Sequence, residues 1–185
     1  MLSWQSRIAC HVLRNGGVIA YPTEAVWGLG CLPQCKEAVQ RILDLKNRSV
    51  DKGLILVAAS TAQLSPYLEG LTKAELRRLD ESWPGPVTWL VPDNGAAPSW
   101  VKGSHQTVAL RVSDHPIIQS ICNTVGSAIV STSANITGRQ PIREPLKLRQ
   151  QFGPHLDYIY AGELGGARTV TAIRHLREDR LVRGG

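Results

Sequence analysis

Apolar positions along this chain fall into two patterns, helical spacing and short uninterrupted runs. Helical spacing predicts helices over 2–15, 36–46 and 114–125, a further helix near 145–152, and two short helices within 61–82. Apolar and β-branched runs predict strands over 18–21, 54–59, 87–91, 107–112 and 128–132, with two weaker strands near 157–160 and 181–183. Helices and strands mix without strict alternation, which predicts an α/β (α+β) chain with a twisted, open mixed sheet flanked by helices.

Local signals mark where these elements begin and end. Thr72, followed three residues later by Glu75, predicts a capping box at the start of the second short helix. Residues 83–86, Trp-Pro-Gly-Pro, predict a rigid turn, because the two prolines fix φ and Gly85 permits a positive φ. Residues 22–30 are expected to end the first strand and form a turn, and 92–106 to form a mobile loop. With no internal repeat or low-complexity linker, we expect a single domain over 1–185.

Residues 41–57 place three cations, Lys46, Arg48 and Lys52, on the short connection between a helix and a buried strand. A helix C-terminus favours positive charge, which accounts for Lys46 and in part for Arg48. Lys52 lies beyond the helix, and a connection anchored on both sides is a good place to fix charges toward a ligand. The stretch taken alone leaves both interpretations open.

Composition narrows the class of protein. The chain has 185 residues, of which 43% are hydrophobic and 19% charged, and a net charge of +6. No apolar run approaches the roughly 20 residues that a membrane helix needs, and residues 1–20 lack a signal-peptide layout. We therefore expect a soluble, cytoplasmic protein without a membrane partner. The excess of positive charge suggests a polyanionic ligand such as a nucleotide, RNA or pyrophosphate.

Several common chemistries are excluded by their missing motifs. Gly28-x-Gly30 is followed by Pro33 where a dinucleotide fingerprint needs its third glycine, and no Walker motif, G-x-S-x-G or H-E-x-x-H occurs. The four cysteines lack both a disulfide framework and a second ligand pair at zinc spacing, so no metal site is predicted from protein ligands. His115, before Pro116, is interpreted as a capping or core residue rather than as a base.

What remains is a set of hydroxyls and cations near predicted strand ends. Ligands of open α/β sheets tend to bind beyond the carboxyl ends of the strands, where these side chains would converge. Cations and hydroxyls without a carboxylate cluster suit a phosphate-bearing ligand, and any Mg²⁺ would be held mainly through the phosphates of that ligand. The set comprises Thr23, Lys46, Arg48, Lys52, Thr107, Arg111, Ser131, Ser133 and Asn135.

With these residues in place, the chain resembles the YrdC/TsaC family of threonylcarbamoyl-AMP synthases. The resemblance runs over nearly the whole chain and rests on six motifs in order. These are Tyr21 to Cys31 (YPTEAVWGLGC), Leu45 to Arg48 (LKNR), Asp51 to Ile55 (DKGLI), Trp83 to Thr88 (WPGPVT), Val108 to Val112 (VALRV) and Ser131 to Asn135 (STSAN). The family pairs a Lys-x-Arg with a Ser-x-Asn, present here as Lys46/Arg48 and Ser133/Asn135.

The resemblance implies a YrdC/RibB-like fold with a positively charged concave cavity. It implies that L-threonine, bicarbonate and ATP give threonylcarbamoyl-AMP and pyrophosphate, and that the product serves the modification of adenosine 37 in tRNAs reading ANN codons. A downstream threonylcarbamoyl-transferase complex (TsaB, TsaD, TsaE) is the implied partner, and the sequence leaves open whether tRNA is bound directly. By resemblance, Thr23, Arg111 and Ser131 would contact threonine, and Arg48, Lys52, Thr107, Ser133 and Arg183 the nucleotide, with Lys46, Arg48, Ser133 and Asn135 acting in catalysis.

Two departures and two alternatives accompany this resemblance. The family often has Pro after the Lys-x-Arg, where this chain has Ser49, and residues 139–185 match least well. A non-catalytic RNA-binding module that uses a basic cavity would be an alternative, although no RNA-binding motif and little aromatic interleaving are present. A small-molecule carbamoyl-transfer domain, like the related domain of HypF, is a further alternative; the zinc-finger and acylphosphatase segments of that protein are absent from this sequence.

Overall fold

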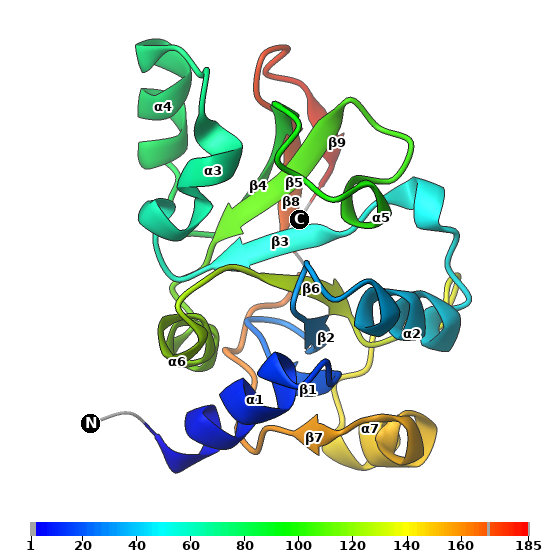
Figure 1. Cartoon of the computed structure of the whole chain (residues 1–185). Coiled ribbons are helices and arrows are strands. Elements are labelled where there is room, and N and C mark those ends of the chain that lie inside the picture. Colours follow the sequence, from blue (N-terminus) through cyan, green and yellow to red (C-terminus); the bar gives the residue numbers. More distant parts are fainter. Residues whose placement is uncertain (1–2, 170, 185) are drawn as a thin grey trace.

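Nine strands form one mixed sheet in the computed structural model, which describes residues 3–169 and 171–184 (Figure 1). The sheet order is β7-β1-β2-β6-β3-β5-β4-β8-β9. Three neighbouring pairs, β1/β7, β3/β5 and β4/β8, are parallel, and the other pairs are antiparallel. The strands are β1 (Ile19–Pro22), β2 (Trp27–Cys31), β3 (Ile55–Ala58), β4 (Val87–Pro92), β5 (Thr107–Val112), β6 (Ile129–Ser133), β7 (Tyr158–Ile159), β8 (Ala172–His175) and β9 (Leu181–Arg183).

Helices flank this sheet, and all of them except α5 lie where the sequence predicted helices. They are α1 (Trp4–Arg14), α2 (Lys36–Lys46), α3 (Ser65–Leu68), α4 (Lys73–Asp80), α5 (Ser99–Lys102), α6 (Pro116–Val125) and α7 (Pro145–Gln151), with short 3-10 helices at Val50–Lys52, Thr61–Leu64 and Gly153–His155. The predicted capping box of α4 is confirmed: Thr72 Oγ1 accepts from the Glu75 N–H at 3.2 Å, and Glu75 accepts from the Thr72 N–H at 2.7 Å. No helix in the described part of the chain is long and apolar enough to cross a membrane.

Three predictions about local structure were wrong. The expected turn over 22–30 contains strand β2, the expected loop over 92–106 contains the short helix α5, and strand β8 was missed. Glycines concealed β2: the ring of Tyr21 lies across this strand, and a Cβ on Gly30 would stand 2.9 Å from that ring and 2.7 Å from the Val130 carbonyl. Gly30 is thus required by close packing inside a sheet, and it does not mark a turn.

Side chains alternate between two faces of the sheet, and each face has its own core. One face carries Leu56, Leu110 and Val130, which belong to the larger apolar cluster packed beneath α2, α3, α4 and α5. The other face carries Val57 and Ile129, which pack against α1 and α6. Figure 1 shows α1 and α6 beside each other, below β3. These two helices cover only part of the second face.

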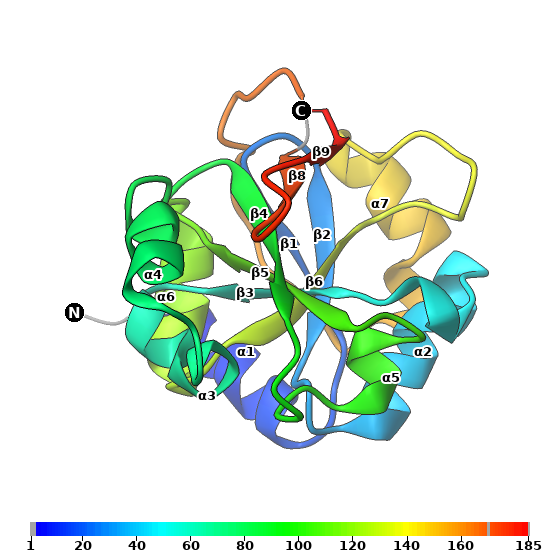
Figure 2. The same cartoon turned by 90° about the horizontal axis from the view of Figure 1, so that it is seen from above.

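The sheet twists strongly, as predicted. In Figure 2 the strand direction turns progressively from β2 through β6 to β3, so that β3 crosses the direction of β2. The right-handed twist of β-strands produces such a turn between neighbours. A twisted sheet presents a concave surface, and the uncovered part of its second face holds the candidate site.

Candidate active site

A cavity of ≈ 360 Å³ opens on the part of the second sheet face that α1 and α6 leave uncovered. Register explains which side chains reach it: Ile55 pairs with both Ala109 of β5 and Ser131 of β6, so all three point to the same side. Every second residue of five strands follows the same rule. The cavity is therefore lined by Ile55 and Val57, Thr107, Ala109 and Arg111, Ser131 and Ser133, Thr88 and Leu90, and Ile173, and also by Thr171 just before β8.

Eight predicted site residues line this one cavity. They are Thr23, Arg48, Lys52, Thr107, Arg111, Ser131, Ser133 and Arg183. The place of convergence differs from the prediction, however. Thr107 is the first residue of β5 and Ser131 lies in the middle of β6, so the residues meet on the open face of the sheet and not beyond the carboxyl ends of its strands. The mixed strand directions leave no common carboxyl edge between β3, β5 and β6.

Lys46 and Asn135 lie behind the cavity wall and are not among its lining residues. The Lys46 ammonium is buried and donates to the carbonyl oxygens of Ser133 and Asn135, the latter at 3.0 Å, and to Asn135 Oδ1 at 3.3 Å. Ser133 Oγ donates to the same Oδ1 at 2.7 Å. Burial, together with the nearby Arg48 charge, lowers the pKa of Lys46 to about 8. Lys46 and Asn135 together fix the loop that follows β6, and thereby the direction of the Ser133 side chain.

Among the residues that the structure describes, the cavity is lined by cations and by one carboxylate. Arg48, Lys52, Lys102, Arg111 and Arg183 are the Lys and Arg residues of the lining, and Glu24 is the acid. Burial lowers the pKa of Arg48, and the neighbouring Arg183 lowers it further. The Arg48 Nε is buried without a hydrogen-bond partner in the described structure. Two guanidinium groups held close together with an unpaired donor suit an anionic ligand.

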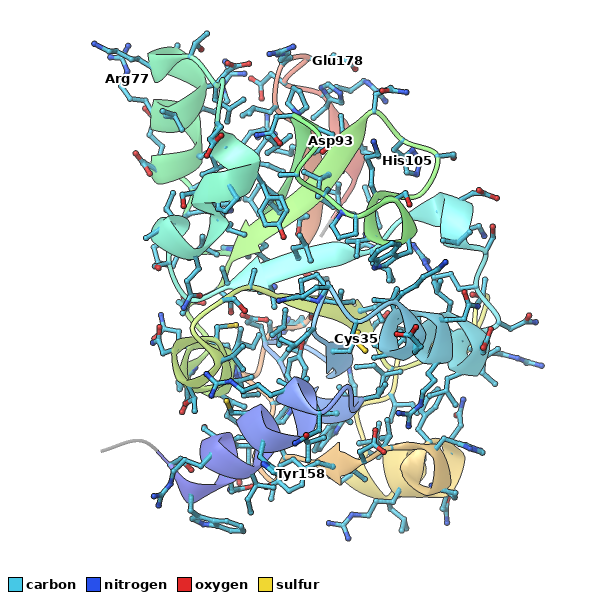
Figure 3. The ribbon with its side chains drawn as sticks, viewed as in Figure 1. Cys35, Arg77, Asp93, His105, Tyr158 and Glu178 are labelled. Atoms are coloured by element: carbon cyan, nitrogen blue, oxygen red, sulfur yellow. The ribbon has the colours of Figure 1, made fainter. Side chains whose placement is uncertain are left out.

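Arg48 is positioned by the backbone that follows it. Its Nη2 donates to the carbonyls of Lys52 at 3.3 Å and Gly53 at 2.9 Å. The 3-10 helix Val50–Lys52 packs on the loop after α5, where the Ser104 N–H donates to the Asp51 carbonyl at 3.2 Å. Figure 3 shows His105 on that loop, and His105 also lines the cavity. Segment 47–53 and the segment 92–106, which was predicted as a mobile loop, are thus in mutual contact at the cavity.

Arg111 forms a side-chain ion pair that the sequence did not reveal. Its Nη2 lies 2.7 Å from Glu24 Oε1, its Nη1 donates to Glu24 Oε2 at 3.2 Å, and its Nε donates to the Gly85 carbonyl at 2.9 Å. Ser113 Oγ donates to Glu24 Oε1. The guanidinium and this hydroxyl hold the pKa of Glu24 below its usual value in spite of burial. Sequence reasoning missed both Glu24 and Ser113. The one available signal was the presence of an acid, Glu24, in a motif next to a set of cations.

The hydroxyls of the site are also held by neighbours. The fully buried Tyr21 donates to Ser131 Oγ at 2.8 Å, and burial raises the pKa of Tyr21. Thr23 Oγ1 donates to the Val26 carbonyl at 2.7 Å. The Thr23 hydroxyl proton is used in its bond to Val26, so this oxygen can only accept from a ligand. Ser131 accepts from Tyr21, so its own hydroxyl proton is free to be donated to a ligand.

The residues considered for other chemistry lie outside the cavity lining. His115 is the N-cap residue of α6 and is 6% exposed, and burial lowers its pKa. The four cysteines are free. Within residues 3–169 and 171–184, no group of three His, Cys, Asp or Glu residues could hold a metal ion. Glu24 does line the cavity, but its carboxylate is already paired with Arg111 and accepts from Ser113.

The fold is thus a twisted mixed α/β sheet with a hollow lined by cations and hydroxyls, a set of groups that suits an anionic ligand. The comparison with protein families is more specific: residues 11–185 match the Sua5/YciO/YrdC family model, described as "Telomere recombination". The chain belongs to this family, which confirms the resemblance seen in the sequence.

Named relatives extend over the full chain. A threonylcarbamoyl-AMP synthase of Nitrosococcus oceani is 49% identical over 181 residues, covering 98% of each chain. A protein of the same name from Pseudomonas aeruginosa is 50% identical, covering 98% of this chain and 97% of its own. Among solved structures, Pyrococcus abyssi Sua5 complexed with L-threonine aligns with a TM-score of 0.87 and 30% identity over 97% of this chain. The present chain spans about half of that protein, 54% of its length.

Proposed function

We propose that this protein is a threonylcarbamoyl-AMP synthase, which forms L-threonylcarbamoyladenylate and pyrophosphate from L-threonine, bicarbonate or CO₂, and ATP. The observation that carries the proposal is the convergence of eight predicted residues from distant segments on one cavity. The names of relatives about 50% identical over the whole chain support it, as does the threonine complex of the similar Sua5. The enzyme is then a nucleotidyltransferase with ATP as a substrate.

The proposed roles follow the chemistry of each group. Arg48 and Lys52 offset the charge of the triphosphate, together with Arg183, and Thr107 and Ser133 contact the nucleotide. Ser131, whose hydroxyl proton is left free by Tyr21, donates to the carboxylate of threonine, and Arg111 donates to the same group. Thr23 accepts from an N–H or O–H of threonine, since its own proton is committed. Lys46 and Asn135 act in catalysis by holding the Ser133 segment.

The proposed reaction asks little covalent work of the protein. The amine of threonine attacks CO₂ and loses a proton, or attacks bicarbonate with loss of water, to give a carbamate. A carbamate oxygen then attacks the α-phosphorus of ATP as pyrophosphate leaves. Positioning of the two reactants and stabilisation of negative charge by Arg48 and Lys52 should dominate the rate enhancement. Carbamates are labile in water, which favours a site enclosed by segments 47–53 and 92–106.

A magnesium ion fits this site as a companion of ATP. The described part of the lining offers one carboxylate, which is already paired, and Mg²⁺ is commonly bound through substrate phosphates and water with few protein ligands. The ion would neutralise phosphate charge, while Arg48, Lys52 and Arg183 would hold the phosphate oxygens that it leaves free.

The product sets the cellular context that we propose. Threonylcarbamoyladenylate is an activated, labile mixed anhydride, so an acceptor must take it over soon after release. We assign this role to the threonylcarbamoyl transfer onto adenosine 37 of tRNAs that read ANN codons, performed in the cytoplasm by the TsaB, TsaD and TsaE complex. Direct tRNA contact by the basic surface belongs to the same proposal.

A pyrophosphate-release assay tests the proposed activity. Purified protein is incubated with ATP, L-threonine and bicarbonate, and pyrophosphate and a new adenylate are quantified. We expect both products to require threonine, and serine to substitute poorly. Absence of threonine-dependent pyrophosphate, with salt-sensitive RNA binding in its place, would favour the non-catalytic RNA-binding alternative.

A further inference from the structure

Glu24 occupies a face of Arg111 that would otherwise be free to bind a carboxylate ligand. A guanidinium carries five N–H donors, and its two Nη groups together form the fork that binds a carboxylate bidentately. In this structure both Nη groups of Arg111 already contact the two oxygens of Glu24, at 2.7 and 3.2 Å. The third nitrogen, Nε, donates to the Gly85 carbonyl at 2.9 Å.

Glu24 is itself held by segments from distant parts of the chain. Ser113 Oγ, from the connection between β5 and α6, donates to Oε1. The Glu24 carbonyl accepts the Ala167 N–H at 2.8 Å, and the preceding Thr23 carbonyl accepts the Gly165 N–H at 3.0 Å. Gly165 lies so close that a Cβ there would stand 3.0 Å from Glu24 Cα. The position of the Glu24 carboxylate is therefore fixed by these contacts, unlike that of a mobile surface side chain.

From this geometry we propose that Glu24 is a positioning residue for the threonine subsite, which locks Arg111 in one orientation. Within the described residues, Nη1 donates to Glu24, whereas Nη2 lies 2.7 Å from Oε1 but is buried without a hydrogen-bond partner, so its donors are not committed. A substrate carboxylate then meets Arg111 in a fixed orientation, together with the Ser131 hydroxyl, and does not displace Glu24. The inference rests on the proposed function and deepens it, because it assigns a role to a residue that does not bind the substrate carboxylate itself.

Charge is part of the same role. Arg111 is 7% exposed, and a buried guanidinium without a counter-charge is costly. With Glu24 in place the pair is close to neutral, so the site attracts the threonine carboxylate through directed hydrogen bonds more than through net charge. Replacing Glu24 by Gln keeps the shape but turns one oxygen into an NH₂ donor, which would face an Nη donor of Arg111.

The test compares threonine and ATP kinetics in Glu24→Gln with a matched control. We expect the KM for threonine to rise about tenfold, because a hydrogen-bonded charge pair that orients Arg111 is lost, while the KM for ATP stays near wild type. The control is Asp157→Asn, which also removes a carboxylate paired with an arginine, Arg41 at 2.9 Å, and bonded to a backbone N–H, that of Val18 at 2.7 Å. Asp157 is not among the cavity-lining residues, so both KM values should stay unchanged.

A second variant and a binding measurement keep the test decisive if Glu24→Gln folds poorly. Glu24→Asp retains the charge one methylene further back and should give a threonine KM between those of the wild type and the Gln variant. The thermal stabilisation of each variant by threonine, measured without turnover, should fall in the same order. Unchanged threonine KM and threonine-induced stabilisation in a folded Glu24→Gln variant, or equal rises in both KM values, would overturn the inference. A wild-type protein without threonine-dependent pyrophosphate release would instead overturn the proposed function.

Discussion

The two faces of the sheet are built from the same strands but have opposite characters. In β3, β5 and β6, the residues Leu56, Leu110 and Val130 are fully buried beneath α2 to α5. Their immediate neighbours Arg111 and Ser131 point to the other side and line the cavity. These side chains of the first face pack in the core, and those of the second face line the cavity. Because the two sets point to opposite sides, we expect a substitution in one set to have little effect on the other.

The difference arises from how far the covering helices extend. On the second face, α1 and α6 cover Ile129 and part of Val57 but stop before the polar residues of β5 and β6. Val57 and Ile118 of α6 both belong to the core and to the cavity wall, so they form the boundary between the two functions. The cavity is therefore a rigid surface supported from behind by the larger core, as a positioning site requires.

The largest effect is expected from removing the charges of the open face. Arg48→Ala and Lys52→Ala should each lower threonine-dependent pyrophosphate release by about 100-fold or more, because each removes a fixed donor to developing phosphate charge. Thermal unfolding should show that both variants remain folded. Lys147→Ala provides the control, since Lys147 pairs with Glu144 on the surface of α7, away from the cavity. Near wild-type turnover in both cavity variants would reject their assigned roles.

A core-face substitution should give the opposite result. Leu56→Ala removes a fully buried side chain and should lower the free energy of unfolding by about 2–5 kcal/mol, measured by denaturant titration. The KM for ATP of the folded fraction should stay near wild type, because Leu56 points away from the cavity. A large change in that KM with little loss of stability would show that the two faces are not separable.

The ion pair at the boundary should appear in the pH dependence of stability. Arg111 and Ser113 depress the pKa of Glu24 below its ordinary value of 4.5. A carboxyl whose pKa is lower in the folded state contributes stability that is complete above pH 4.5 and is lost as the pH falls through the folded pKa. The difference in unfolding free energy between the wild type and Glu24→Gln should therefore be constant at neutral pH and shrink below pH 4.5. A difference independent of pH down to pH 3 would contradict the ion pair.

The smallest effect is expected at a helix cap on the core side. Thr72→Ala removes one half of the capping box of α4 and should cost about 1 kcal/mol of stability. Kinetic constants should not change, since α4 lies over the face opposite the cavity. A measurable rise in either KM would mean that α4 influences the site through the sheet.

Much of the fold was predictable because its elements carry local signals. The apolar run at 54–59 predicted β3, Thr72 and Glu75 predicted the start of α4, and Gly126 follows the last apolar residue of α6. Strand β8 was missed because its four residues, Ala-Ile-Arg-His, form neither an apolar run nor a clear alternation, although β9, one of its two neighbours in the sheet, follows it directly in the chain. Strand β2 was missed because Gly30 is needed by the ring of Tyr21, a contact that spacing does not reveal.

Part of the cavity lining was predictable from the sequence, but its arrangement was not. Residue type was enough to select Arg48, Lys52 and Ser133, since cations and hydroxyls suit phosphate. Residue type does not show whether a cation faces the cavity. Arg48 lines the cavity, whereas Lys46, two residues earlier, donates to the Ser133 and Asn135 carbonyls. The partner of Arg111 lies 87 residues away in the sequence, and only the folded chain brings Glu24 beside it.

The most direct measurement is a crystal structure with ATP and L-threonine bound. The account predicts the phosphates within hydrogen-bonding distance of Arg48 and Lys52 on the open face, with the carboxylate of threonine beside Ser131 and Arg111 and with the Glu24–Arg111 pair intact. Nucleotide density elsewhere on the molecule, with this face empty, would contradict the central claim.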